Sequence, residues 1–175
     1  MDKKNDIVRF LAPVLYVLSK TGQLDKHQLF KILYFADKAH IAAYGRTFTE
    51  DVYVAMLNGP VPSRLYDYVK IIEGKYTLPV QTDFVEELSA HIATATPYIV
   101  IPLKEADGKF LSRSAIKFLD ESISKYRGKS FGELTEASHD EAWKAAARND
   151  HMSTIEIAKS AGVNDEMLKY IQEKM

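Results

Sequence analysis

Cysteine is absent from the 175 residues of the chain. The protein therefore cannot form a disulfide, bind a metal through thiolates or use a cysteine nucleophile, and such a chain fits the reducing cytoplasm. A surplus of charge is also missing, because 23 Lys and Arg residues stand against 24 Asp and Glu residues, for a formal net charge of −1. The chain has no overall positive field that would attract nucleic acid or an anionic membrane, so any binding surface must be local.

Long apolar runs are missing as well. No segment approaches the ~20 apolar residues that a membrane-spanning helix needs. The apolar stretch near the start is interrupted by Arg9, and no small-residue cleavage site follows it. We therefore expect a cytoplasmic protein with no membrane segment, whose first helix runs from about Asp6 to Ser19.

The motifs of common enzymes and metal sites are missing too. The chain has no glycine-rich phosphate loop and no serine elbow, and its five histidines include no pair at the i, i+4 spacing with which a helix chelates zinc. We expect no metal, no cofactor and no catalytic residue. The sequence therefore predicts a protein that is not an enzyme.

The chain does contain enough apolar material for one core. Hydrophobic residues make up 46% of the sequence, which suits a single domain of this length. Because these residues recur mostly at helical spacing, we expect a mainly α fold. It should be a single compact domain of about seven or eight helices with a small antiparallel sheet or hairpin. Residues 1–150 should form its main part, and residues 151–175 a C-terminal helical hairpin packed on it.

A central helix is predicted to begin after Asp25. This residue is a typical N-cap, and Gln28 three positions later completes the pattern of a capping box. A polar strip lies around His27, Lys31 and Lys38, whereas apolar side chains surround the remainder. A helix that is apolar on most sides is expected to be buried in the middle of the core.

Asp37 lies in this helix beside the apolar stripe of Leu29 and Leu33, next to Tyr34. A buried carboxylate must be paired. Arg46, shortly after the helix, is the nearest cation in sequence with the bidentate geometry that suits a carboxylate. We therefore predict an ion pair between Asp37 and Arg46 that holds the following loop against the helix.

The pattern then changes to that of a strand over residues 52–57, which read VYVAML. The next segment, Asn-Gly-Pro-Val-Pro, predicts a rigid turn, because Gly59 allows unusual backbone angles and the two prolines fix theirs. A helix should follow over residues 63–73, with Leu65 and Tyr68 facing inward.

Capping signals mark the later helices. Ser112 precedes a long amphipathic segment, and both Ser130 with Glu133 and Ser138 with Glu141 have the spacing of a capping box. We therefore expect a long helix that ends near residue 128, followed by two short helices.

Two places could suggest acid–base catalysis. His139 has acidic neighbours on its C-terminal side, and Asp37 lies one helical turn before His40. A small hydrolase that uses His139 and Asp37 is therefore an alternative function. The structural interpretation is favoured, because acids in the first turn of a capped helix and a histidine in the last turn are stabilised without any catalytic role.

The segment from Ser153 onward is similar to the helix-turn-helix of transcription regulators, because Ile-Ala-x-x-Ala-Gly-Val is followed by Leu168 and Tyr170. A DNA-binding regulator is therefore a second alternative. Its recognition helix would open with Asp165 and Glu166, where phosphates and base edges require donors or positive charge. This charge favours a helical hairpin that does not bind DNA.

Four segments occur in a characteristic order: QLFKILYFADKAH, YGRTFTEDVYVAMLNGPVPSRLYDYV, LSRSAIKFLDESISKY and LTEASHDEAWKAA. Together they resemble the Panacea domain, which is found in SocA-like antitoxins and in phage-associated proteins of the GepA type. The resemblance covers about residues 24–147. The positions that match the family's motifs are Lys31, Ile32, Leu33 and Tyr34, then Ala55, Gly59, Pro60 and Val61, and finally Ser138, His139 and Trp143.

The resemblance implies an antitoxin of a toxin–antitoxin system, which directly binds and neutralises a toxin encoded beside it. The partner would be a cognate protein toxin, and the oligomeric state stays open. A binding module needs a rigid surface with large contact side chains, which the Gly-Pro-Val-Pro segment and the adjacent helix would supply. We predict that Asn58, Arg64 and Tyr66 contact the partner.

Overall fold

The computed structural model of the protein describes residues 3–174, and this range forms nine α-helices, one short 3-10 helix and five short strands. The predicted mainly helical fold with small antiparallel sheets is confirmed. None of the described helices is both long enough and apolar enough to cross a membrane. In chain order the elements are α1 Lys3–Thr21, β1 Leu24–Asp25, α2 Lys26–Tyr44, β2 Tyr53–Met56, β3 Gly59–Pro62, α3 Ser63–Ile72, α4 Thr82–Ser89, β4 Ile92–Thr94, β5 Ile99–Pro102, η1 Gly108–Phe110, α5 Arg113–Tyr126, α6 Phe131–Ser138, α7 Glu141–Ala145, α8 Thr154–Ser160 and α9 Asp165–Lys174.

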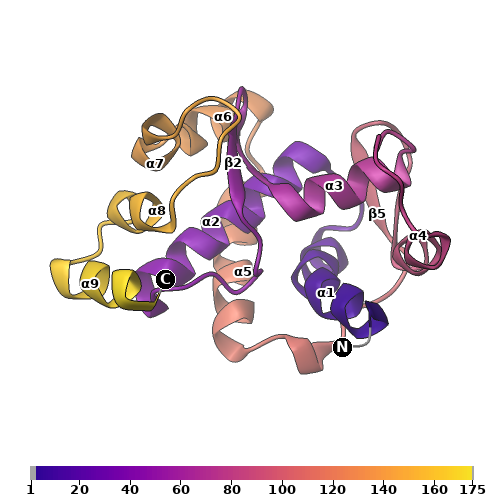
Figure 1. Ribbon diagram of the computed structural model, residues 1–175, viewed down its shortest axis with the longest axis horizontal. Coiled ribbons are helices and arrows are strands. Elements are labelled where there is room, and N and C mark those ends of the chain that lie inside the picture. Colours follow the sequence, from indigo (N-terminus) through magenta and orange to yellow (C-terminus); the bar gives the residue numbers. More distant parts are fainter. Residues whose placement is uncertain (1–2, 175) are drawn as a thin grey trace.

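Helix α2 runs through the middle of the molecule, between α1, α3 and α4 on one side and α7, α8 and α9 on the other (Figure 1). Most of its central residues are buried, as its apolar pattern predicts. Asp25 caps it, because its carboxylate accepts the backbone N–H of His27 at 2.8 Å. Gln28 is not the partner in a capping box, since its side-chain amide donates to the carbonyl of Arg127 at 2.6 Å.

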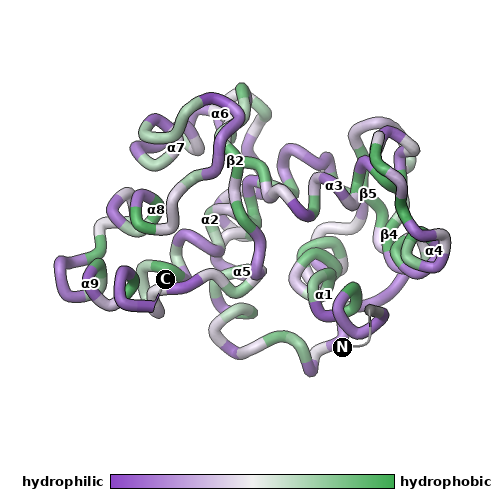
Figure 2. Tube along the Cα trace, viewed as in Figure 1, coloured by the Kyte–Doolittle hydropathy of each residue, from purple (hydrophilic) through white to green (hydrophobic). Residues whose placement is uncertain are grey.

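Buried side chains form two clusters that share α2. The larger cluster joins α1, α2, α3 and α5 and includes Leu11, Leu33 and Leu119. The second cluster joins α2 to the β2–β3 hairpin and the C-terminal helices, through residues such as Tyr53 and Ile157. Figure 2 shows hydrophobic segments at β2 and β5 and a largely hydrophilic α9 at the left edge of the molecule.

The strands form two small antiparallel sheets. One has the order β1-β5-β4, and the other is the β2–β3 hairpin, in which Met56 faces Gly59. Leu57 and Asn58 therefore form the two-residue loop, and the Gly-Pro-Val-Pro segment is a strand rather than the predicted turn. Its prolines are tolerated because they lie in β3, an edge strand that pairs with β2 alone.

The segment after residue 150 forms α8 and α9, which are the two helices of the predicted hairpin. Helix α8 contacts α2 and α7, and both Ile157 and Ile171 are buried in the second cluster. Helix α9 begins with Asp165 and Glu166, so its N-terminal turn is acidic. The domain boundary at residue 150 stays a prediction, and residues 1, 2 and 175 lie outside the described residues.

Candidate functional site

The motif residues meet around the β2–β3 hairpin. Lys31 of α2 donates a hydrogen bond from Nζ to the carbonyl of Pro60 at 2.9 Å. Gly59 has a φ of +99°, and a Cβ at this position would lie 2.2 Å from Oγ of Ser138 and 2.9 Å from Cε of Lys31. Only glycine can adopt this backbone angle and also leave room for Lys31 of α2 and Ser138 of α6. Gly59 therefore allows the hairpin to lie close to both helices.

Lys31 is fully buried, although the sequence places it in a polar strip. Its residue is 0% exposed, and burial lowers the pKa of its ammonium group to about 7. The difference arises because β3, which lies 28 or more residues further along the chain, covers this face of α2. His27 and Lys38, the other members of the strip, are half-buried.

Helix α7 is fixed to the hairpin and to α2 by two side chains. Trp143 donates its indole N–H to the carbonyl of Met56 in β2 at 2.9 Å. The carboxylate of Asp140 accepts the hydroxyl of Tyr34 and the ammonium group of Lys38, each at 2.7 Å. These contacts give the family motifs a structural role, because they hold the hairpin between α2 and α7.

The start of α7 differs from the prediction. Asp140 is its N-cap, since the carboxylate accepts the backbone N–H of Trp143 at 3.0 Å. Ser138 is instead the last residue of α6, and its hydroxyl donates to the carbonyl of Thr135 at 3.1 Å, so the predicted capping box at Ser138 is wrong. His139 lies between the two helices and stacks on the ring of Trp143, with 3.7 Å between the ring centroids.

Asp37 is buried as expected, but the predicted ion pair with Arg46 is wrong. Its Oδ1 accepts the backbone N–H groups of Phe48 and Thr49 at 2.9 and 3.3 Å, and its Oδ2 accepts the hydroxyls of Thr49 and Tyr53. Arg46 is exposed. Burial raises the pKa of Asp37 to about 6, although these hydrogen bonds act to lower it. The loop is therefore held against α2, but by its own N–H and hydroxyl donors.

The hydrolase interpretation gains no support from these positions. Asp37 is 1% exposed and is surrounded by donors, so a substrate cannot reach it. His139 is stacked on the ring of Trp143. Lys31 and Ser138, which lie close to each other at Gly59, are both fully buried, so they are not open to a substrate either. Within residues 3–174 no group of three or more His, Cys, Asp or Glu residues is placed to hold a metal ion.

Asn58 is exposed at the tip of the hairpin. Its carbonyl lies 3.2 Å from Nε2 of His27, whose ring stacks on Phe131 at 4.0 Å between centroids. Burial lowers the pKa of His27 to about 4, so this ring is neutral near pH 7. Two large apolar side chains at this tip, Leu57 and Phe131, are 60% and 55% exposed, and the sequence patterns did not single them out.

Arg64 and Tyr66 lie on different sides of α3, since two residues correspond to about 200° of helical rotation. The guanidinium group of Arg64 lies 4.1 Å from the ring centroid of Phe10, and its Nε donates to the hydroxyl of Tyr68 at 2.9 Å. The ring of Tyr66 stands edge-on to Phe30 of α2, with 6.1 Å between centroids. Both predicted contact residues are half-buried.

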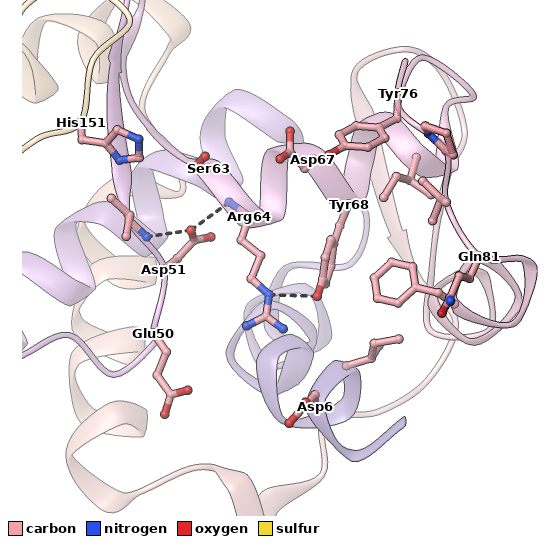
Figure 3. A pocket seen from close by; sticks show the side chains of 16 residues that line it. Asp6, Glu50, Asp51, Ser63, Arg64, Asp67, Tyr68, Tyr76, Gln81 and His151 are labelled. Atoms are coloured by element: carbon pink, nitrogen blue, oxygen red, sulfur yellow. Dashed lines mark hydrogen bonds between the residues drawn. The ribbon is translucent and has the colours of Figure 1, made fainter. Parts of the chain in front are cut away.

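Arg64 opens onto a groove of about 730 Å³ that lies between α1, α3, α4 and the segment before α4, and we call it the α3 groove (Figure 3). Figure 3 shows Arg64 and Tyr68 side by side, with Asp6 and Asp67 on opposite sides of them. Asp51 lies at the start of α3, where its carboxylate accepts the backbone N–H of Arg64 at 2.9 Å. The groove wall is therefore fixed by hydrogen bonds at the N-terminus of α3.

Comparison with known proteins identifies the class of the chain. A family model described as "Antitoxin SocA-like, Panacea domain" matches residues 29–144, which is more than half of the chain. The protein therefore belongs to the family of SocA-like antitoxins with a Panacea domain, and the resemblance found in the sequence is confirmed. No curated protein and no solved structure gives a significant match.

Proposed function

We propose that the protein is an antitoxin that neutralises a cognate protein toxin by binding it directly. The family match carries this proposal. The arrangement of the motif residues supports it, because Lys31, Gly59 and Ser138 are buried supports of a hairpin. A rigid frame of this kind suits a protein that presents a surface to a partner, and it requires no catalytic group.

Growth rescue tests the function. The product of the gene next to this one is expressed alone and then together with the antitoxin, and growth is recorded. We expect growth arrest in the first case and recovery in the second, together with copurification of the two proteins. A neighbouring product that does not arrest growth, or recovery without any complex, would contradict neutralisation by direct binding.

The contact residues Asn58, Arg64 and Tyr66 are proposed as part of the binding surface. Arginine and tyrosine often carry the binding energy of an interface, and a central pair can contribute ~2 kcal/mol each, or roughly thirtyfold in affinity. We expect Arg64→Ala with Tyr66→Ala to weaken the complex by at least this factor in isothermal titration calorimetry. Circular dichroism checks that the variant is folded, because both side chains also pack on neighbouring rings. Unchanged affinity in a folded variant would place the contact elsewhere.

A further inference from the structure

The α3 groove has an apolar floor that the core leaves partly uncovered. Three half-buried side chains line this floor: Ile71 of α3, Val80 of the segment between α3 and α4, and Phe84 of α4. The ring of Tyr68 stands edge-on to Phe84, with 5.4 Å between centroids. These contacts hold the floor in place before any partner binds, so little side-chain entropy is lost when the floor is covered.

Carboxylates border this floor. Asp6, Glu50 and Asp67 lie around the groove, and Arg64 is the one lysine or arginine among the described residues that line it. Glu50 is already paired with Arg9 of α1, so Asp6 and Asp67 are the carboxylates that a partner can use. Asp67 forms a half-buried ion pair with Lys70, one turn further along the same helix, at 2.6 Å. Ion pairs that still reach solvent contribute little to stability, so a cation of a partner can replace Lys70 at small cost.

The groove is open to solvent rather than enclosed. Its volume would accommodate a small ligand, but ligand pockets usually surround the ligand and direct free polar groups at it. Here the carboxylate of Asp51 is engaged by the backbone N–H groups of Arg64 and Leu65, and Nε of Arg64 by the hydroxyl of Tyr68. An open, apolar groove with an acidic border is better suited to a peptide segment that lays several side chains into it.

We propose that the α3 groove receives an amphipathic, basic segment of the toxin. Its apolar side chains would cover Ile71, Val80 and Phe84, and a lysine or arginine would lie beside Asp6 or Asp67. The proposal rests on the proposed antitoxin function and adds the contact surface and the chemistry of the partner segment. Complementary charge of this kind increases the association rate and disfavours acidic segments.

Two synthetic amphipathic peptides of equal length test this proposal, one made of leucine and lysine and the other of leucine and glutamate. Binding to the full-length protein is measured by fluorescence anisotropy. We expect the lysine peptide to bind at least about tenfold more tightly than the glutamate peptide. Asp6→Lys with Asp67→Lys should weaken binding of the lysine peptide by about tenfold or more, because attraction becomes repulsion.

A matched control separates the groove from net charge. Glu105→Lys with Glu136→Lys changes the formal charge by the same amount at exposed positions that do not line the groove. This variant should keep its affinity for the lysine peptide within about twofold, because salt screens distant charges. Equal losses in both variants, no loss in the groove variant, or no binding of the lysine peptide to the unmodified protein would overturn the proposal.

Growth rescue separates this proposal from the proposed function. If the unmodified protein binds the lysine peptide but does not rescue growth, the antitoxin function fails and the groove remains a peptide site. If the folded variant with Asp6→Lys and Asp67→Lys still rescues growth and copurifies with the toxin as well as the control variant does, the groove is not the toxin site. We expect the groove variant to lose rescue and the control variant to keep it.

Discussion

Replacement of Gly59 by alanine should lower the free energy of unfolding by about 4 kcal/mol. The φ of +99° is unfavourable for a residue with a side chain and costs ~1–3 kcal/mol. The added methyl group would also lie 2.2 Å from Oγ of Ser138 and 2.9 Å from Cε of Lys31, and overpacking of this kind costs ~1–3 kcal/mol more. Urea unfolding followed by circular dichroism measures the loss.

Gly74→Ala is the matched control for this variant. Gly74 also has a positive φ, of +68°, but a Cβ there would meet nothing within 4 Å. Its replacement should therefore cost only the backbone contribution, about 1 kcal/mol. If both variants lose the same free energy of unfolding, the close approach of the hairpin to Lys31 and Ser138 contributes nothing to the cost of the substitution.

Asp37→Ala should lower the free energy of unfolding at pH 7 by ~3 kcal/mol or more. The substitution leaves the N–H groups of Phe48 and Thr49 and the hydroxyls of Thr49 and Tyr53 without their acceptor. Each unsatisfied buried donor costs ~1–3 kcal/mol, and release of a desolvated carboxylate offsets part of this loss. Thermal and urea unfolding measure the change, and the loop between α2 and β2 should become accessible to protease in the same variant.

Arg46→Ala distinguishes this explanation from the ion pair that the sequence suggests. Arg46 is exposed, so its replacement should change the free energy of unfolding by no more than about 0.5 kcal/mol. A loss comparable to that of Asp37→Ala would restore the ion pair as the main interaction of this carboxylate.

The effect of Asp37 should also depend on pH. Because the pKa of Asp37 is raised to about 6 in the folded protein, its bound proton stabilises the fold at low pH, and this contribution is lost as the pH rises through 6. The alanine variant lacks this group. The difference in stability between the two proteins should therefore be larger near pH 4 than near pH 7.

The sequence predicted local features of the fold because these features depend on neighbouring residues. Asp25, Ser112 and Ser130 cap α2, α5 and α6 as predicted, and the Ser130–Glu133 capping box is present. A cap requires only a suitable side chain within three residues of the first free N–H groups. The prediction at Ser138 was wrong because Asp140 offers a competing carboxylate two residues later.

Contacts between distant segments could not be predicted in this way. The helical pattern of α2 places Lys31 on its polar strip, and nothing near it in sequence indicates that β3 covers this strip. The pairing of Asp37 was predicted from the nearest cation, but backbone donors carry no sequence signature, so Phe48 and Thr49 were missed as partners. The α3 groove has the same origin, since it combines residues of α1, α3 and α4.

The burial of the motif residues has a consequence for how such a chain could diversify. Lys31, Gly59 and Ser138 match motifs of the family, yet they are enclosed within the fold. Side chains that line the α3 groove, such as Val80 and Asp67, lie outside that arrangement and can be exchanged without disturbing it. Two chains with identical motifs can therefore have unrelated binding partners, and a protein engineer could retarget the scaffold by varying its groove while the buried hairpin stays fixed.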